Sequence, residues 1–145
     1  MKNSYLRLPL RPDLLVKRKE HPLCSLSESI AQNLQLLVTT YQGECKFDET
    51  FGSPVWDADF ENIPSINVWK TKTAKDLESI LKQKERRLMD PKVAVNLFQE
   101  EVMNEMVSAL MVKRKMELRI SAKIEATNET FEFETMFYFS PISFD

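Results

Sequence analysis

Acidic side chains are the residues of this sequence that could do chemistry, because the groups that most other catalytic and metal sites require are scarce. His21 is the only histidine. A zinc site with two or more histidine ligands is therefore excluded. A serine or cysteine nucleophile activated by a histidine base is also not expected. Two carboxylates could still act together, as they do in glycoside hydrolases. The candidates for such a pair are Glu44, Asp48 and Glu85.

Nothing in the sequence fixes the distance between these carboxylates, so we expect a protein without catalytic residues, cofactor or metal ion. The two glycines, Gly43 and Gly52, are too widely spaced for a phosphate-binding loop. The 20 basic and 22 acidic residues give a net charge of −2, which argues against a dedicated nucleic-acid binder. There is no signal peptide and no apolar run near the ~20 residues that span a bilayer, so we expect a cytoplasmic protein without direct membrane insertion.

Residues 117–139 carry the clearest secondary-structure pattern and would position any interaction surface. Small or apolar residues alternate with polar ones from Leu118 to Ala126, and again from Phe131 to Phe139 beyond a short polar turn. This alternation predicts an amphipathic antiparallel hairpin whose apolar face needs a cover of helices. The hairpin is either an ordinary half-buried ribbon or one that offers a free edge to a strand of another chain. The residues predicted to line that edge are Arg119, Ile120, Ala122, Ile124, Phe131, Phe133 and Phe137.

Helices are predicted to cover this hairpin. Ser25 and Glu28 have capping-box spacing, and apolar residues at helical spacing follow, so the first helix should cover about 27–41. A second helix is predicted over about 74–89, after a connection in which 66–69 is extended.

A third helix is predicted from Asp90 and Pro91, which resemble an N-cap and a first helical residue, to about 112. The alternation at 92–97 leaves open a short strand followed by a shorter helix. The fold class is therefore α+β, with a small antiparallel sheet and a C-terminal β-hairpin packed against about three helices. We expect a single domain over 25–145, preceded by an N-terminal arm over 1–24.

Two charged residues of the second predicted helix lie at the edge of its apolar stripe. Glu85 and Arg87 fall on opposite shoulders of the stripe at 100° per residue. Residues two apart on a helix do not face each other, so these two are not expected to pair. Each is either a solvated surface charge or a group that needs a partner from another element or another chain.

The segment 43–60 interleaves aromatic and acidic residues, and Gly52 and Pro54 prevent it from forming a helix. We predict a structured loop whose aromatic side chains turn inward. The aromatic residues are Phe47, Phe51, Trp56 and Phe60.

Three stretches together resemble a known family, the phage baseplate wedge proteins of lysozyme-like type. Residues 29–52 resemble its N-terminal signature of a helix ending in threonine, then Gly-Glu, then an aromatic loop ending in glycine. Residues 85–88 (Glu-Arg-Arg-Leu) resemble the Glu-Pro-Arg-Leu motif of the bacterial branch, the TssE baseplate subunit of type VI secretion, with Arg86 in place of proline. The predicted C-terminal hairpin lies where the family has its own. The matching residues of the loop signature are Thr39, Thr40, Gly43, Glu44, Phe47, Phe51 and Gly52.

The resemblance implies a structural role and no catalysis. It implies a wedge subunit that initiates the contractile sheath, with its hairpin pairing with strands of sheath subunits and with Glu85, Arg87 and Leu88 contacting the hairpin or a wedge neighbour. The implied partners are other baseplate wedge proteins and sheath subunits, in a hetero-oligomeric baseplate docked at the inner membrane. The same role in a phage tail or a phage-derived injection particle is the alternative, and a peptidoglycan hydrolase is the second alternative.

Overall fold

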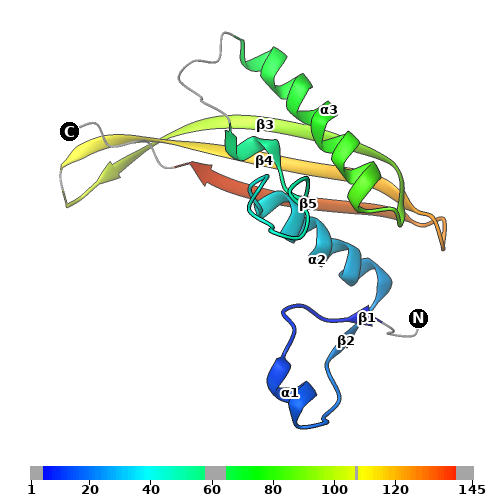
Figure 1. The fold of residues 1–145 in the computed structure, drawn as a ribbon. Helices are drawn as coiled ribbons and strands as arrows, with labels where there is room; N and C mark the ends of the chain where they lie inside the picture. The colour runs from blue at the N-terminus through cyan, green and yellow to red at the C-terminus, as the bar shows by residue number, and fades with distance from the viewer. Residues whose placement is uncertain (1–4, 58–64, 107, 140–145) are drawn as a thin grey trace.

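A three-stranded antiparallel sheet carries two helices, and a small unit of two short strands and one short helix precedes them (Figure 1). The computed structural model describes residues 5–57, 65–106 and 108–139. The strands of the sheet are β3 (Leu88–Asn104), β4 (Ala109–Ile124) and β5 (Thr130–Phe139), in the order β3-β4-β5. The predicted α+β class and the predicted C-terminal hairpin, formed by β4 and β5, are both confirmed.

The core lies on one face of this sheet. Alternate residues of β4, beginning at Met116, turn inward and are buried, whereas the residues between them face solvent. Helix α2 (Leu26–Thr39) and helix α3 (Ile66–Lys84) cover the inward face, as antiparallel sheets with one solvated face require. The helical side chains that complete the core are Ile30, Leu34, Leu37 and Val38 of α2 and Leu77 and Leu81 of α3.

Helix α2 begins where its capping box predicts. The Ser25 hydroxyl accepts a hydrogen bond from the backbone N–H of Glu28, and the Glu28 carboxylate accepts one from the backbone N–H of Ser25. These two bonds satisfy donors that have no partner within the helix. None of the helices in the described parts of the chain is both long and apolar enough to cross a bilayer.

The predicted bounds of the second helix are wrong at both ends. Helix α3 begins at Ile66, because the hydroxyl of Ser65 accepts a hydrogen bond from the backbone N–H of Val68 and caps the first turn. The segment 66–69, expected to be extended, is the first turn of this helix. The helix ends at Lys84, so Glu85 and Arg87 are outside it.

The predicted third helix is wrong. In the alternative, the strand at 92–97 is confirmed, but the shorter helix after it is also wrong, because the strand continues to Asn104. Asp90 has a left-handed backbone (φ 47°) and cannot act as an N-cap, and Pro91 is buried in a bulge between Met89 and Lys92. Beyond the bulge the β-branched residues Val93 and Val95 favour a strand over a helix. Residues 100–104 then continue to pair with β4 beyond the last described residue of β5, whose described residues pair with 114–123.

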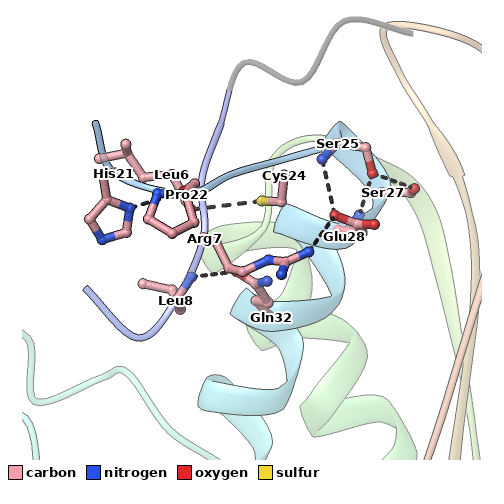
Figure 2. Close-up of polar contacts among 10 residues, drawn as sticks. All are labelled: Leu6, Arg7, Leu8, His21, Pro22, Cys24, Ser25, Ser27, Glu28 and Gln32. Carbon is pink, nitrogen blue, oxygen red and sulfur yellow. Dashed lines mark hydrogen bonds and ion pairs between the residues drawn. The ribbon is translucent and has the colours of Figure 1, made fainter. Parts of the chain in front are cut away.

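The predicted N-terminal arm contains a small ordered unit over residues 5–24. Strand β1 (Tyr5–Leu6) pairs with β2 (Leu23–Cys24), and helix α1 (Pro12–Val16) lies between them in the chain. The unit is joined to α2, because the backbone N–H of Leu8 donates to the Gln32 side chain at 2.9 Å (Figure 2).

Candidate interaction site

The outer edge of β5, the side away from β4, is a candidate surface for another chain. No strand within residues 5–57, 65–106 and 108–139 pairs with β5 on this side. The N–H of Ile124 donates to the carbonyl of Glu129 at 2.9 Å, which fixes the phase of the β4–β5 ladder. Antiparallel pairs alternate between bonded and non-bonded, so every second residue of β5 directs its backbone N–H and carbonyl outward. Those residues are Thr130, Glu132, Glu134, Met136 and Tyr138.

The outer edge of β3 is less available than that of β5. The backbone N–H of Val93 points away from β4 and donates to the carboxylate of Glu78 on α3 at 3.1 Å. The bulge before Lys92 also interrupts the strand near its start. A bulge and a helix lying along the strand are two ways in which proteins block edge pairing. Among the described strands, β5 therefore has the less obstructed outer edge.

Several residues predicted to line a hairpin edge lie on the central strand instead. Strand β4 has β3 on one side and β5 on the other, so its backbone between 115 and 123 is paired in both directions, and Ile124 pairs with Leu88 and donates its N–H to the carbonyl of Glu129. The prediction of an edge position is wrong for these residues because it did not include β3. They are Arg119, Ile120, Ala122 and Ile124.

The predicted aromatic residues of the edge strand do lie on β5, but their side chains turn inward. Phe131 is buried, and Phe133 and Phe137 pack against the core. Phe137 meets the ring of Trp56 edge-on, with 5.3 Å between centroids. These side chains hold β5 in place, and its backbone remains available on the outer side.

Glu85 and Arg87 form a bidentate ion pair, contrary to the prediction that they would not face each other. Arg87 Nε donates to Glu85 Oε1 and its terminal nitrogen to Oε2, both at 2.8 Å. The prediction assumed a helix through residue 89, but α3 ends at Lys84 and the chain turns between them. Leu88, the last motif residue, is buried in the core, so only Arg87 of these three presents a side chain to solvent.

The ion pair joins α2 to the start of β3. Asn33 donates to Glu85 at 2.7 Å, and Arg87 donates to the hydroxyl of Ser29 at 2.8 Å. Burial raises the pKa of Glu85, but the hydrogen bonds from Arg87 and Asn33 outweigh it and hold that pKa below its usual 4.5. The carbonyl of Arg87 also accepts the N–H of Glu125, beside the hairpin turn. Ser29 and Asn33 were not predicted, although polar residues four apart beside an apolar stripe are a usable signal.

The loop signature closes on itself and is anchored to α3. The carboxylate of Glu44 accepts the N–H of Tyr41 at 2.9 Å, and the Asp48 carboxylate binds Lys84 of α3 at 2.6 Å. Trp56, in a short 3-10 helix over Pro54–Asp57, donates from its ring nitrogen to Val38 at 2.9 Å. The aromatic side chains Phe51 and Trp56 pack inward as predicted, Phe47 is fully exposed, and Phe60 lies outside the described residues.

Gly52 is expected to be intolerant of a side chain. It has φ +138°, and an added Cβ would lie 2.8 to 2.9 Å from backbone atoms of Thr40, Tyr41 and Gln42. We expect Gly52→Ala to lower the free energy of unfolding by about 3 kcal/mol, from backbone strain and overpacking together. Gly43→Ala is the matched control, because Gly43 has φ +87° with open space around it, and should cost roughly 1 kcal/mol. Chemical denaturation of both variants measures the difference, and equal losses would contradict the steric argument.

The carboxylates considered for hydrolysis do not have the properties of a general acid. Such an acid needs a raised pKa, whereas hydrogen bonds from Lys84 and Thr50 lower the pKa of Asp48 to about 2 and that of Glu85 is also lowered. Glu44 caps the backbone of Tyr41. Within the described residues there is also no group of three or more His, Cys, Asp or Glu side chains that could hold a metal ion.

Comparisons with known proteins match most of the chain. The model of the family described as baseplate wedge protein gp25 matches residues 24–129. A crystal structure from Geobacter sulfurreducens, of a protein provisionally described as a tail lysozyme, is 18% identical with a TM-score of 0.58, over 86% of this chain and 100% of that one.

A chain in the baseplate complex from the type VI secretion system is 16% identical with a TM-score of 0.49, over 78% of this chain and 93% of that one. At these identities a structural likeness concerns the fold alone. The comparison with curated proteins gives no match.

Proposed function

Because the chain belongs to the family of the baseplate wedge protein gp25, we propose that it is a structural baseplate subunit of a type VI secretion system that initiates the contractile sheath. Initiation takes place by strand pairing at the C-terminal hairpin. The family is one of baseplate wedge proteins in contractile injection systems, and the sheath-initiating role is our proposal for this member.

The observation that carries the proposal is the open outer edge of β5. Ten residues, Thr130–Phe139, form a strand that pairs with a described strand on one side, and no described strand lies along its other side. A strand from a sheath subunit would pair with this edge and form hydrogen bonds with the outward N–H and carbonyl groups of alternate β5 residues. Backbone hydrogen bonds would supply affinity that does not depend on sequence. The exposed side chains of the same residues, among them Glu132 and Glu134, would supply register and specificity.

The Glu85–Arg87 pair contributes by fixing the hairpin in place. Its hydrogen bonds to α2 and the bond from Glu125 to Arg87 hold the turn of the β4–β5 hairpin against the helices. A rigid strand loses less conformational freedom when it pairs with a partner. The partly exposed guanidinium of Arg87 is the group of this motif that could also contact a wedge neighbour.

The type VI assignment depends on the resemblance of residues 85–88 to the motif of that branch, and the phage tail or phage-derived particle remains the second candidate. The wedge partners would be other baseplate proteins, in a cytoplasmic baseplate docked at the inner membrane. The neighbouring genes would distinguish these two candidates. A sheath gene among secretion genes would support the type VI secretion system, and a sheath gene among tail genes would support the phage tail or phage-derived particle.

Nucleation of sheath polymerisation tests the proposal. The sheath protein from the same gene neighbourhood should polymerise with a shorter lag when the purified chain and its wedge partners are added. A fluorescent fusion should mark one end of each sheath in cells, and deletion of the gene should leave sheath subunits dispersed. Sheaths of normal number and length in the deletion strain would overturn the proposal.

The hydrolase alternative has a direct test. Purified murein incubated with the chain should keep its turbidity, because none of the three candidate carboxylates has the environment of a general acid. A fall in turbidity that disappears in Glu85→Gln or Glu44→Gln would establish hydrolysis and contradict a purely structural role.

A further inference from the structure

The N-terminal unit, residues 5–24, differs from the rest of the chain in charge and lies almost wholly outside the family match. It contains five basic and two acidic residues, a net charge of +3, whereas residues 25–145 contain 14 basic and 20 acidic residues, a net charge of −6. The family model matches from residue 24 onward. The function of this unit is therefore to be sought in its own surface.

Three consecutive cations of the unit have no acidic partner in the part of the chain that the structure describes. Lys17, Arg18 and Lys19 follow helix α1 and are exposed, and none of them forms an ion pair with any described residue. By contrast, Arg7 lies 3.8 Å from Glu28 and Arg11 lies 2.9 Å from Asp13. The left-handed backbone of Arg18 (φ 55°) forms part of the turn that presents the three cations.

An apolar depression lies in the same unit. Leu6 and Leu23 are opposite each other in the β1–β2 pair, so their side chains share one face, and they are 51% and 47% exposed. With Glu20, His21 and Pro22 they line an open depression of about 740 Å³. Leu10 and Val16 add further exposed apolar surface to a unit of only 20 residues. Solvated leucines at this density are typical of an interaction surface.

The unit is held in shape before any partner binds. The ring of His21 is buried. Its Nε2 accepts the N–H of Arg11 at 2.9 Å, and its Nδ1 lies 3.0 Å from the carbonyl of Pro22, to which it donates. The ring of Tyr5 lies 5.5 Å from the guanidinium carbon of Arg87, and Figure 2 shows the contacts from Arg7 and Leu8 to Glu28 and Gln32 of α2. A pre-organised surface loses little conformational freedom on binding.

We propose that the N-terminal unit is a docking site for an acidic segment of a neighbouring protein that carries leucine or aromatic side chains. The apolar side chains of that segment fill the depression over Leu6 and Leu23. The carboxylates of the segment contact the three cations at 17–19, and these cations make the site selective for an acidic partner. The occupant is a peptide segment and not a lipid surface, because the apolar residues line a hollow and α1, at five residues, is too short to lie along a membrane.

Binding of a labelled peptide to the full chain tests this docking site. A peptide of about 12 residues with alternating glutamate and leucine should bind, measured by fluorescence anisotropy, and its affinity should fall as salt rises. A matched peptide with lysine in place of glutamate should not bind, and one with serine in place of leucine should bind at least about tenfold more weakly. Failure of the glutamate–leucine peptide to bind, or equal binding of all three, would overturn the proposal.

Matched charge reversals locate the site. The variant K17E/R18E/K19E should weaken binding about tenfold or more. The control K72E/K75E/K82E, which reverses three exposed lysines of α3, should change it less than about twofold. Both triplets are at the surface, so the thermal transitions should match that of the unmodified chain. Equal effects of the two variants would refute the site.

Vesicles of phosphatidylglycerol serve as the competing probe for a lipid surface. The full chain should remain in the supernatant when such vesicles are sedimented. Sedimentation with the vesicles that is lost in K17E/R18E/K19E, without peptide binding, would replace the proposal with a membrane contact. Because peptide binding does not require a sheath, this outcome is independent of the test of sheath initiation.

Discussion

Met136→Pro is expected to abolish sheath nucleation while leaving the protein folded. Met136 lies on β5 with its backbone N–H directed outward, so proline at this position removes no hydrogen bond of the β4–β5 ladder. A partner strand on the outer edge would no longer receive a hydrogen bond from the backbone N–H of residue 136. The partner carbonyl opposite this position would be buried without a hydrogen bond, and the proline ring would obstruct the approach of the strand. We expect a loss of roughly 2–3 kcal/mol in binding free energy, about 30- to 150-fold in affinity.

Two matched variants separate loss of the edge from loss of the fold. Met136→Ala shortens a half-exposed side chain and keeps the backbone N–H, so it should support nucleation almost as well as the unmodified chain. Thr135→Pro lies one residue away, where the N–H faces β4, and should destabilise the domain strongly because it removes a bond of the ladder. Sheath assembly in cells and the lag of polymerisation in vitro are the measurements, with thermal unfolding as the check on folding.

Normal nucleation by a folded Met136→Pro protein would show that the outer edge of β5 is not the site of pairing. A nucleation defect of the same size in Met136→Ala would instead assign the effect to the side chain. In either case the backbone pairing proposed here would be wrong, while membership of the baseplate wedge family would be unaffected.

The sequence predicts best where one period of alternation is repeated without ambiguity. Strands 117–126 and 130–139 alternate over many residues on both sides of a polar turn, and the structure confirms this hairpin. The first helix is recovered because its capping box and its apolar stripe agree. The resemblance to the baseplate wedge family is likewise confirmed by the family match over residues 24–129.

The failures arise where two patterns compete within one segment. Apolar residues between 93 and 110 satisfy both the helical and the strand period, and Asp90-Pro91 has the form of a helix start. The left-handed φ of Asp90 and the bulge after it, which no local pattern reveals, decide for a strand. The missing strand then changes the site as well, because β3 covers one side of β4, and of the two hairpin strands it is β5 that has an outer edge over residues 130–139.

The pairing of Glu85 with Arg87 depends on a helix end that the sequence does not mark. Neither a glycine nor a proline follows Lys84, so the helical pattern runs on to Leu88. Once the helix stops at Lys84, residues two apart can face each other, and Glu85 and Arg87 can form an ion pair. A buried carboxylate held by three side-chain donors is then a feature of the chain that should be sensitive to substitution.

Arg87→Met is expected to be among the most destabilising substitutions in this protein. The side chain of Glu85 is only 2% exposed, and without Arg87 its charge would be buried with Asn33 as the one side-chain donor left among the described residues. Breaking a buried ion pair from one side costs roughly 3–5 kcal/mol, and the partial exposure of Arg87 places the expected loss at about 3 kcal/mol. The double variant Glu85→Met with Arg87→Met should lose less than the sum of the two single variants, because it leaves no charge unpaired. Urea denaturation of the three variants measures this, and strict additivity would contradict the account.

The same pair should make stability depend on pH in the acid range. The pKa of Glu85 is lower in the folded protein than its usual value of 4.5, so the unfolded chain binds the proton more tightly. The stabilisation is therefore complete well above pH 4.5 and is lost as the pH falls through the lower pKa of the folded state. In Glu85→Gln this part of the acid dependence should disappear, while the part due to Asp48, whose pKa is about 2, should remain. An unchanged slope of unfolding free energy against pH between about 5 and 3 would show that Glu85 has the same pKa in the folded and unfolded states, and its charge would then not stabilise the folded protein through the ion pair.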